Sequence, residues 1–383
     1  MHYQFLPTDW QQATLVGRIQ TGDGPTPVVL SNGRVFDVSK ATPTVSHLLN
    51  HWTGAVSGSD IGSVEEVFAK CGITSTPDYA LQSRSSLLAP FDLQCIKACG
   101  VTFAVSTVER VIEERARGDA AKALSIRQAL QERMGGDIRS VKPGSESAMK
   151  LKQALIADGL WSQYLEVGIG PDAEVFTKAP VLSSVGYGDW IGVRDDSVWN
   201  NPEPEVVLAC NSQAKIVGAA LGNDVNLRDI EGRSALLLGK AKDNNASCAI
   251  GPFIRVFDQH FTLDDVRNAV VTLEVVGDDG FSLTGESSMS LISRDPLELL
   301  KQTTAQHQYP DGIALFCGTM FAPTKDRDAA GGGFTHKQGD IVRVASTKLG
   351  MLENKVTSCK QAPPWTAGIG ELMHNLAKRG LLS

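Results

Sequence analysis

The chain has 383 residues, 42% hydrophobic and 21% charged, which are the proportions of an ordinary folded protein. Its formal net charge of −7, without a cluster of Lys and Arg among aromatic residues, argues against a nucleic-acid-binding surface. The length exceeds that of a typical domain, so we expect two domains or one large domain with an appendage.

The sequence contains no signal for a membrane or for export. No run of 18 apolar residues occurs, which predicts no transmembrane helix. The stretch from Met1 to Trp10 lacks the basic start and apolar centre of a signal peptide. The seven cysteines are scattered, odd in number and without Cys-x-x-Cys spacing, so we expect mostly buried thiols in a reducing cytoplasm.

The first part of the chain has short apolar bursts and local turn signals. Asn32-Gly33 between two such bursts predicts a β-hairpin. Ser63 and Glu66 have the spacing of a capping box, which predicts a helix ending near Gly72. We therefore expect a small α+β N-terminal domain over residues 1–77, followed by a larger domain over residues 78–383.

The larger domain is expected to contain both helices and many short strands. A long charged stretch over residues 107–134 has helical spacing with a break at Gly118, and a second helix is expected at about 147–159. Residues 181–347 alternate short apolar runs with Gly, Asn and Asp, without the strand–helix alternation of a nucleotide-binding fold. Residues 367–378 predict a surface helix.

Three carboxylates stand out within this strand-rich part. Glu203 and Glu205 are separated by one residue on an extended segment, so they point to the same face. The following apolar run, the polar reversal at residues 211–213 and a second apolar run predict a hairpin that returns Asp224 to the two glutamates. Oxygen ligands alone favour Mg²⁺, with Mn²⁺ or Ca²⁺ as alternatives. The other interpretation is a solvated strand start and an unrelated loop aspartate.

The wider pattern around these carboxylates resembles the fumarylacetoacetate hydrolase family. The resemblance extends from about Leu87 to Val356 and rests on blocks in the same order and spacing, at residues 203–208, 222–229, 240–242, 248–253, 316–319, 338–342 and 349–354. It implies a strand-rich α+β domain of that type, a mixed β roll, with lid helices at about 106–134. It also implies that Glu203, Glu205 and Asp224 bind magnesium or calcium, and that Lys242 and Thr319 bind substrate.

One block departs from the pattern of the hydrolytic relatives. Those members carry Asn-Tyr-x-x-His-x-x-Glu, whose His and Glu activate water, whereas this chain has Ser106 at the His position and retains Glu109. A serine hydroxyl does not act as a base near neutral pH, so this departure argues against hydrolysis of C–C bonds. Ser106 is expected to hydrogen-bond Glu109; alternatively, Ser106 is a helix N-cap and Glu109 completes a capping box.

Residues 88–119 are similar to the branch of the family that dehydrates 2-keto-3-deoxy sugar acids. This similarity implies a magnesium-dependent hydro-lyase that converts 2-dehydro-3-deoxy-D-pentonate (the D-arabinonate or D-xylonate form) into 2,5-dioxopentanoate in oxidative pentose catabolism. The alternatives are an acylpyruvate or diketo-acid hydrolase and a non-catalytic metal-binding protein. Relatives are usually dimers, so we expect a homodimer or a higher homo-oligomer.

Residue roles follow from the same resemblance. Glu109 and Lys242 are the candidate proton-transfer groups, either of which can be the base, and Ser106 is placed beside them as a catalytic residue. The substrate-binding candidates are Lys242, Thr319, Gly318 and Phe103. Lys242 can instead form a salt bridge behind the metal ligands. Arg228 and Asp229 are expected to form a structural ion pair.

Overall fold

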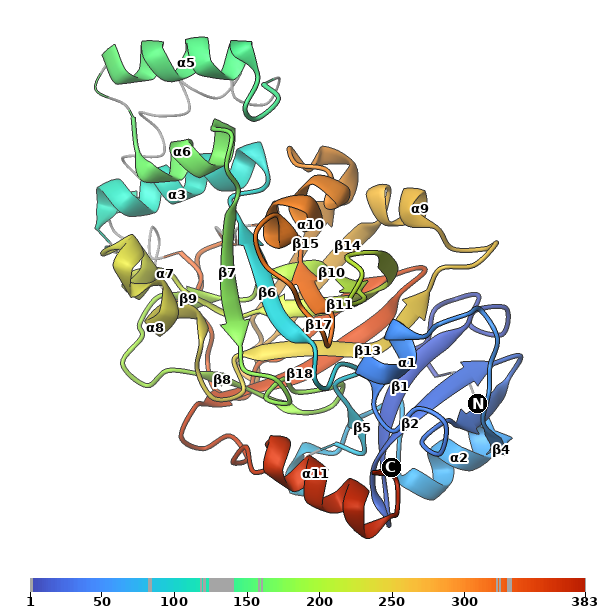
Figure 1. The fold of residues 1–383 in the computed structure, drawn as a ribbon. Helices are drawn as coiled ribbons and strands as arrows, with labels where there is room; N and C mark the ends of the chain where they lie inside the picture. The colour runs from blue at the N-terminus through green and yellow to red at the C-terminus, as the bar shows by residue number, and fades with distance from the viewer. Residues whose placement is uncertain are drawn as a thin grey trace.

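The computed structural model describes residues 3–81, 85–117, 119, 122–123, 141–157, 159, 161–321, 323, 325–328 and 333–382. Within this part of the chain, no helix combines the length and the apolar character needed to span a bilayer. Two large β-sheets form the body of the molecule (Figure 1).

The larger sheet has eleven strands in the order β4-β3-β2-β1-β13-β11-β10-β16-β6-β7, with β5 paired to β1. Neighbouring strands are antiparallel except β16 and β6, which are parallel. The bounds are β1 (Leu15–Thr21), β2 (Gly24–Ser31), β3 (Arg34–Asp37), β4 (Ser59–Ser63), β5 (Leu87–Leu88), β6 (Cys95–Gly100), β7 (Glu174–Ala179), β10 (Pro204–Cys210), β11 (Ile216–Asp224), β13 (Cys248–Val256) and β16 (Ile313–Phe316).

The second sheet has five strands in the order β15-β14-β17-β18-β8. Its bounds are β8 (Trp190–Val193), β14 (Val270–Val276), β15 (Ser282–Ser288), β17 (Ile341–Ser346) and β18 (Gly350–Ser358). A further antiparallel pair joins β9 (Asn200–Asn201) to β12 (Asn226–Leu227).

Strand β10 shows why the centre of the larger sheet is one continuous apolar run. Val206 and Leu208 belong to the main core, which also includes Leu273 of the second sheet. Val207 and its neighbours on the same face belong to a separate core with Phe316. A strand covered on both faces needs apolar side chains at successive positions, as this segment has.

Helices cover the sheets and form one group at an end of the molecule. Figure 1 shows α3, α5 and α6 together beyond the ends of β6 and β7, and α11 at the opposite end. The helices are α1 (Val45–Asn50), α2 (Val64–Cys71), α3 (Ala104–Ala116), α5 (Glu146–Ala157), α6 (Gln163–Ile169), α7 (Arg228–Glu231), α8 (Leu238–Lys242), α9 (Leu263–Arg267), α10 (Pro296–Thr304) and α11 (Ile369–Lys378). Short 3₁₀ turns occupy Tyr79–Leu81, Ala235–Leu237 and Met289–Leu291.

The local predictions for the N-terminal part are confirmed. Ser31 pairs with Arg34, and Asn32 and Gly33 between them have positive φ values of 51° and 75°, as a tight hairpin turn requires. Ser63 and Glu66 form both bonds of the capping box, and α2 ends at a left-handed Gly72. Because β1 pairs with β13, the N-terminal strands continue the larger sheet. The domain boundary between residues 77 and 78 stays a prediction.

The predicted strand-rich α+β class is confirmed, as are the β10–β11 hairpin, the helix now seen as α5 and the surface helix now seen as α11. The long charged stretch was predicted as helix over residues 107–134. Its described helix, α3, begins at Ala104 and ends at Ala116. Residues 124–134 of the expected lid lie outside the described residues.

Candidate active site

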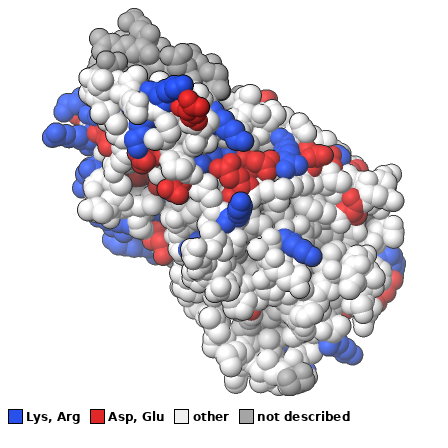
Figure 2. Space-filling model, turned by 45° about the horizontal axis from the view of Figure 1, so that its top comes forward, with Lys and Arg blue, Asp and Glu red and all other residues white. Residues whose placement is uncertain are grey.

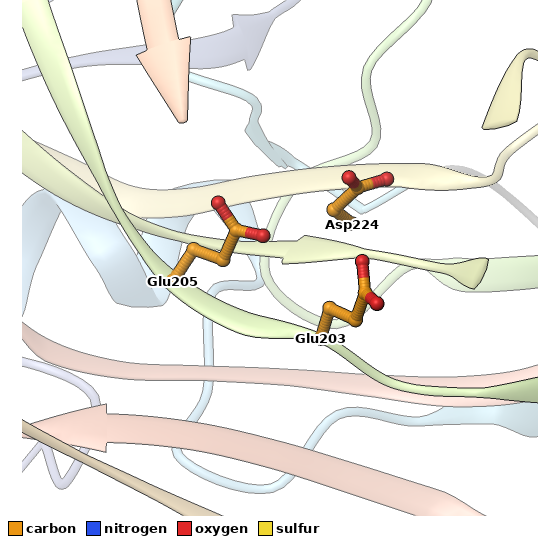
Figure 3. A group of neighbouring side chains, drawn as sticks. All are labelled: Glu203, Glu205 and Asp224. Carbon is orange, nitrogen blue, oxygen red and sulfur yellow. The ribbon is translucent and has the colours of Figure 1, made fainter. Parts of the chain in front are cut away.

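The register of β10 and β11 brings the three predicted carboxylates together. Pro204 pairs with Asn223, and the Asp224 amide donates to the Glu203 carbonyl at 3.0 Å. Glu203, Glu205 and Asp224 are buried, and each offers an oxygen within 4.8 Å of the others. Figure 3 shows the two glutamates along one segment, Glu205 in β10 and Glu203 just before it, with Asp224 beside them. This arrangement is suited to binding a cation.

Basic side chains surround two of these carboxylates. The Lys242 ammonium lies 2.5 Å from Glu203 and 2.9 Å from Asp224. Lys178 lies 2.9 Å from the other oxygen of Asp224, and Arg110 of α3 lies 2.5 Å from Glu203. Lys242 therefore forms a salt bridge with these carboxylates, which the sequence allowed as an alternative to binding substrate.

Glu205 has a different environment, in which the backbone amide of Gly318 donates to its carboxylate at 2.6 Å. Burial and the repulsion of Asp224 and Glu203 raise the pKa of Glu205 well above its usual value. Burial alone would also raise the pKa of Asp224, but the ammonium groups of Lys178 and Lys242 lower it below its usual value. Of the three carboxylates, Glu205 is therefore the one that nearby cationic side chains neutralise least.

The site as a whole has more acidic than basic side chains. Six carboxylates meet in or directly around the cavity, those of Glu109, Glu174, Glu203, Glu205, Asp224 and Glu231. Four cationic side chains oppose them, those of Arg110, Lys178, Arg228 and Lys242. Full ionisation leaves an excess of two negative charges, which one divalent cation would neutralise. Figure 2 shows charged side chains of both signs gathered in its upper part, whereas its lower part is mostly uncharged.

Glu174 is a site residue that sequence reasoning missed. It lies at the start of β7, lines the cavity and pairs across the strands with Gly100. A Cβ atom on Gly100 would come within 2.0 Å of the Glu174 carboxylate, so the glycine makes room for this side chain. Burial, followed by the repulsion of Glu231, raises the pKa of Glu174 to about 7. No motif marks Glu174, and only the pairing of β6 with β7 places it here.

Glu109 lines the cavity from α3, as the sequence analysis expected. Its carboxylate lies 3.5 Å from Arg228, and the guanidinium of Arg228 lies 4.6 Å from the centre of the Trp199 ring. The expected ion pair between Arg228 and Asp229 is wrong. Asp229 instead accepts hydrogen bonds from the Ser197 hydroxyl and the Val198 amide, because its side chain faces the preceding loop.

Ser106 also lines the cavity, but it lies inside the first turn of α3. Its hydroxyl donates to the Phe103 carbonyl at 2.8 Å and accepts from the Phe103 amide at 3.2 Å. The helix begins two residues before Ser106, so Ser106 is not the N-cap residue that the alternative interpretation required.

The predicted substrate-binding residues divide into two groups. Lys242, Thr319 and Gly318 line the cavity. The Gly318 amide donates to Glu205 in this structure, and its contact with substrate stays a prediction. Phe103 is 1% exposed, belongs to the main core and does not line the cavity, so the structure lends no support to contact with substrate.

Arg110, Glu231 and Lys178 are further site residues that carry no sequence signal by themselves. Arg110 bridges Glu203 and, at 3.0 Å, Glu231 of α7. Each belongs to a different element, so only the folded chain shows that they share one charge network.

Comparison with known proteins assigns the part of the chain that holds Glu205 and Asp224. Residues 204–357 match the family described as fumarylacetoacetate (FAA) hydrolase C-terminal. Residues 204–357 therefore form a fumarylacetoacetate hydrolase C-terminal domain. The resemblance stated from the sequence is thereby confirmed at the level of the family.

Two curated relatives of this chain are dehydratases by name. The 2-dehydro-3-deoxy-D-arabinonate dehydratase of Saccharolobus solfataricus is 31% identical over 182 residues, which span 47% of this chain and 57% of that protein. The match thus covers little more than half of that relative. The probable 2-keto-3-deoxyxylonate dehydratase of Haloferax volcanii is 27% identical over 267 residues, which span 64% of this chain and 89% of that protein.

Solved structures agree on the fold over a longer range. A 2-keto-3-deoxy-D-arabinonate dehydratase complexed with magnesium and 2,5-dioxopentanoate superposes with a TM-score of 0.62 at 21% identity, covering 90% of this chain and 99% of that one. A fumarylacetoacetate hydrolase from Exiguobacterium antarcticum gives 0.54 at 16% identity, covering 90% of this chain and 100% of that one. At these identities the likeness establishes the fold of the family and leaves its different reactions open.

Proposed function

We propose that this protein is a magnesium-dependent hydro-lyase that removes water from a 2-keto-3-deoxy sugar acid, converting 2-dehydro-3-deoxy-D-pentonate to 2,5-dioxopentanoate. One observation carries the proposal: a trio of oxygen ligands shares its cavity with three further carboxyl groups, and the described residues that line this cavity include no histidine. The names of the two curated relatives support the same reaction.

The residues fit a hard divalent cation. Glu203, Glu205 and Asp224 would hold it, with Mg²⁺ as the first candidate and Mn²⁺ or Ca²⁺ as alternatives. When bound there, the cation would draw electrons from the keto and carboxylate oxygens of a 2-keto acid and so make the protons on C3 more acidic.

Glu174 is the better candidate for moving the C3 proton. Its pKa of about 7 is close to the working pH, where a carboxyl can both accept and return a proton. Glu174 takes a proton from C3 and delivers it to the hydroxyl on C4, which leaves as water. Further proton shifts from C5 convert the unsaturated alcohol into the aldehyde, so the product is lighter than the substrate by one water.

Glu109 and Lys242 then take roles that agree with their contacts. Glu109 shares the cavity and orients Arg228, and it remains the second candidate for proton transfer. Thr319 and the ammonium of Lys242, which also bridges Glu203 and Asp224, face the cavity in which the carboxylate of the keto acid would be held. Burial alone would lower the pKa of Lys242, but Asp224 and Glu203 raise it above its usual value. This direction argues against Lys242 as the base.

The acylpyruvate hydrolase alternative needs a group that activates water. Ser106 occupies the position of the hydrolytic histidine, and its hydroxyl is hydrogen-bonded to the backbone of Phe103. Such a hydroxyl positions the start of α3 rather than accepting a proton at neutral pH. Ser106 therefore favours dehydration over cleavage of a C–C bond.

We also infer a place for the protein in the oxidative catabolism of pentoses, a cytoplasmic location and a homodimer or a higher homo-oligomer. All seven cysteines are free thiols, and those of Cys99, Cys210, Cys248 and Cys317 are buried. Free thiols are typical of a reducing compartment. Analytical ultracentrifugation of the purified protein tests the assembly, and a sedimentation coefficient of a monomer at micromolar concentration would contradict it.

The reaction itself is tested with a small panel of acids. Purified protein with Mg²⁺ is incubated separately with 2-keto-3-deoxypentonates, their six-carbon analogues and acylpyruvates. The proposal expects rapid loss of one water from a five-carbon acid, abolished by a chelator and restored by Mg²⁺ or Mn²⁺. Turnover of none of the acids would favour a non-catalytic metal-binding protein.

A further inference from the structure

We propose that Lys178 is a positioning residue for the metal site: it makes Asp224 a one-oxygen ligand and fixes the end of the helix that carries Lys242. This inference rests on the proposed metal site and adds to it a residue that touches neither substrate nor metal.

The side chain of Lys178 is 0% exposed, and its ammonium is surrounded by acceptors. It lies 2.9 Å from Oδ1 of Asp224 and donates to the carbonyl of Lys242. The Val225 carbonyl lies 3.3 Å away and the Ser247 hydroxyl 3.4 Å away. Lysine is almost never fully buried unless it is paired, because removing its charge from water is costly. Because burying a lysine here costs free energy, we infer that its ammonium group has a specific role at this position.

The backbone of β7 is shaped to deliver this ammonium. Ala179 pairs with Ile96 and Thr177 pairs with Lys97, so Lys178 has no partner residue in β6 and forms a β-bulge. Bulges occur beside active sites, where they redirect one side chain. Glu174 and Phe176, earlier in the strand and at alternate positions, both line the cavity. One edge strand thus supplies the candidate proton-transfer group at one end and the buried ammonium at the other.

The contact with Asp224 decides how this carboxylate can bind a cation. Lys178 lies at Oδ1, whereas Oδ2 lies 2.9 Å from Lys242, whose ammonium also contacts Glu203. Asp224 is therefore held so that Oδ2 alone is presented to the cation, and its side chain cannot rotate without breaking the contact with a fully buried ammonium.

The contact with the Lys242 carbonyl positions the second partner. Lys242 is the last residue of α8, and carbonyls at a helix end lack a partner within the helix. Lys178 and, at 2.9 Å, the Ser247 hydroxyl both donate to this carbonyl. The same ammonium thus fixes the position of Asp224 and the backbone from which Lys242 reaches Glu203.

The test is binding of Mn²⁺ alone, measured by calorimetry and by electron paramagnetic resonance on the full chain. Lys178→Met keeps the length and removes the charge. Loss of a group that orients a metal ligand weakens metal affinity by about 10–100-fold, so we expect a loss in that range and an altered Mn²⁺ spectrum. Lys97→Met is the matched control, because Lys97 lies in β6 and bonds the exposed Thr177 at 2.8 Å. Its Mn²⁺ affinity should equal that of the parent protein.

The outcomes separate this inference from the proposed function. If the parent protein binds no Mn²⁺, the proposed metal site itself fails. If the parent binds Mn²⁺ and folded Lys178→Met binds it equally well with the same spectrum, the role of Lys178 is overturned, even if the melting temperature falls. Should Lys178→Met not fold, Lys178→Gln retains an uncharged donor group and is expected to fold with a smaller loss of affinity. Unchanged affinity in that variant would also overturn the role.

Discussion

At the scale of single residues, Glu174 and Glu109 lie in the same cavity but have different partners. Glu109 faces the guanidinium of Arg228 at 3.5 Å, whereas Glu174 lies among other carboxyl groups and its pKa is raised to about 7. Glu109 thus has a cationic partner in the cavity, which makes Glu174 the first candidate for proton transfer to be tested. This difference distinguishes the two candidates and can be measured.

Replacing Glu174 by Gln keeps the shape and removes the titrating group. We expect turnover to fall by roughly 10²-fold or more with little change in affinity for the keto acid. Glu109→Gln, the matched control, should have the smaller effect on turnover. Steady-state kinetics of both variants with a 2-keto-3-deoxypentonate provide the comparison, and near-native turnover of Glu174→Gln would assign the proton transfer to Glu109.

The raised pKa of Glu174 also predicts how stability depends on pH. Between its ordinary value of 4.5 and about 7, the folded protein holds a proton at Glu174 that the unfolded chain has lost. The contribution of Glu174 to the free energy of unfolding is therefore fully present below about pH 4.5 and is lost as the pH rises through about 7. The melting temperature of the chelator-treated parent, relative to Glu174→Gln, should fall between about pH 5 and about pH 8. A constant difference would contradict the assignment.

Sequence reasoning reached some of these residues and missed others for a physical reason. Glu203, Glu205 and Asp224 lie on one hairpin, so strand alternation and a tight turn are enough to bring them together. Glu174 comes from a strand that joins the sheet through β6, and its role depends on pairing over a long separation along the chain. Phe103 lies in the main core and outside the cavity lining, and its position in a motif does not reveal which way its side chain points.

At the scale of elements, the helices and turns determined by nearby residues were predicted best. Helix α2 has its capping box and its terminal glycine within ten residues, and both were recognised. The end of α3 at Ala116 lies two residues before the break expected at Gly118, whereas its start at Ala104 lies three residues before the expected one. The joining of β1 to β13 depends on residues more than 200 positions apart, which no local pattern reports.

The cap of α2 gives a test of stability at this scale. Ser63→Ala removes the side chain that accepts from the Glu66 amide at 3.2 Å. Loss of such a cap costs about 1 kcal/mol, so the free energy of unfolding should fall by about that amount. Ser57→Ala, an exposed position outside the helix, serves as the control and should change little. Equal denaturation midpoints for the two variants would contradict the role of the cap.

At the scale of the whole molecule, the excess of two negative charges around the cavity predicts that a divalent cation stabilises the folded state. A ligand that binds only the folded protein at about 100 times its dissociation constant adds about 2.7 kcal/mol. Mg²⁺ should therefore raise the melting temperature of the parent protein. The increase should largely disappear in Glu205→Gln but persist in Glu286→Gln, whose position on β15 is exposed. Equal shifts in both variants would place the cation elsewhere.

The identity of the product tests the central claim most directly. The protein is incubated with Mg²⁺ and either a 2-keto-3-deoxypentonate or an acylpyruvate in separate reactions. The masses of the products are then measured by mass spectrometry. The account predicts a product lighter by one water from the first acid, formed far faster than any cleavage of the second. Two shorter acids from the acylpyruvate at a comparable or greater rate would contradict the lyase and favour the hydrolase.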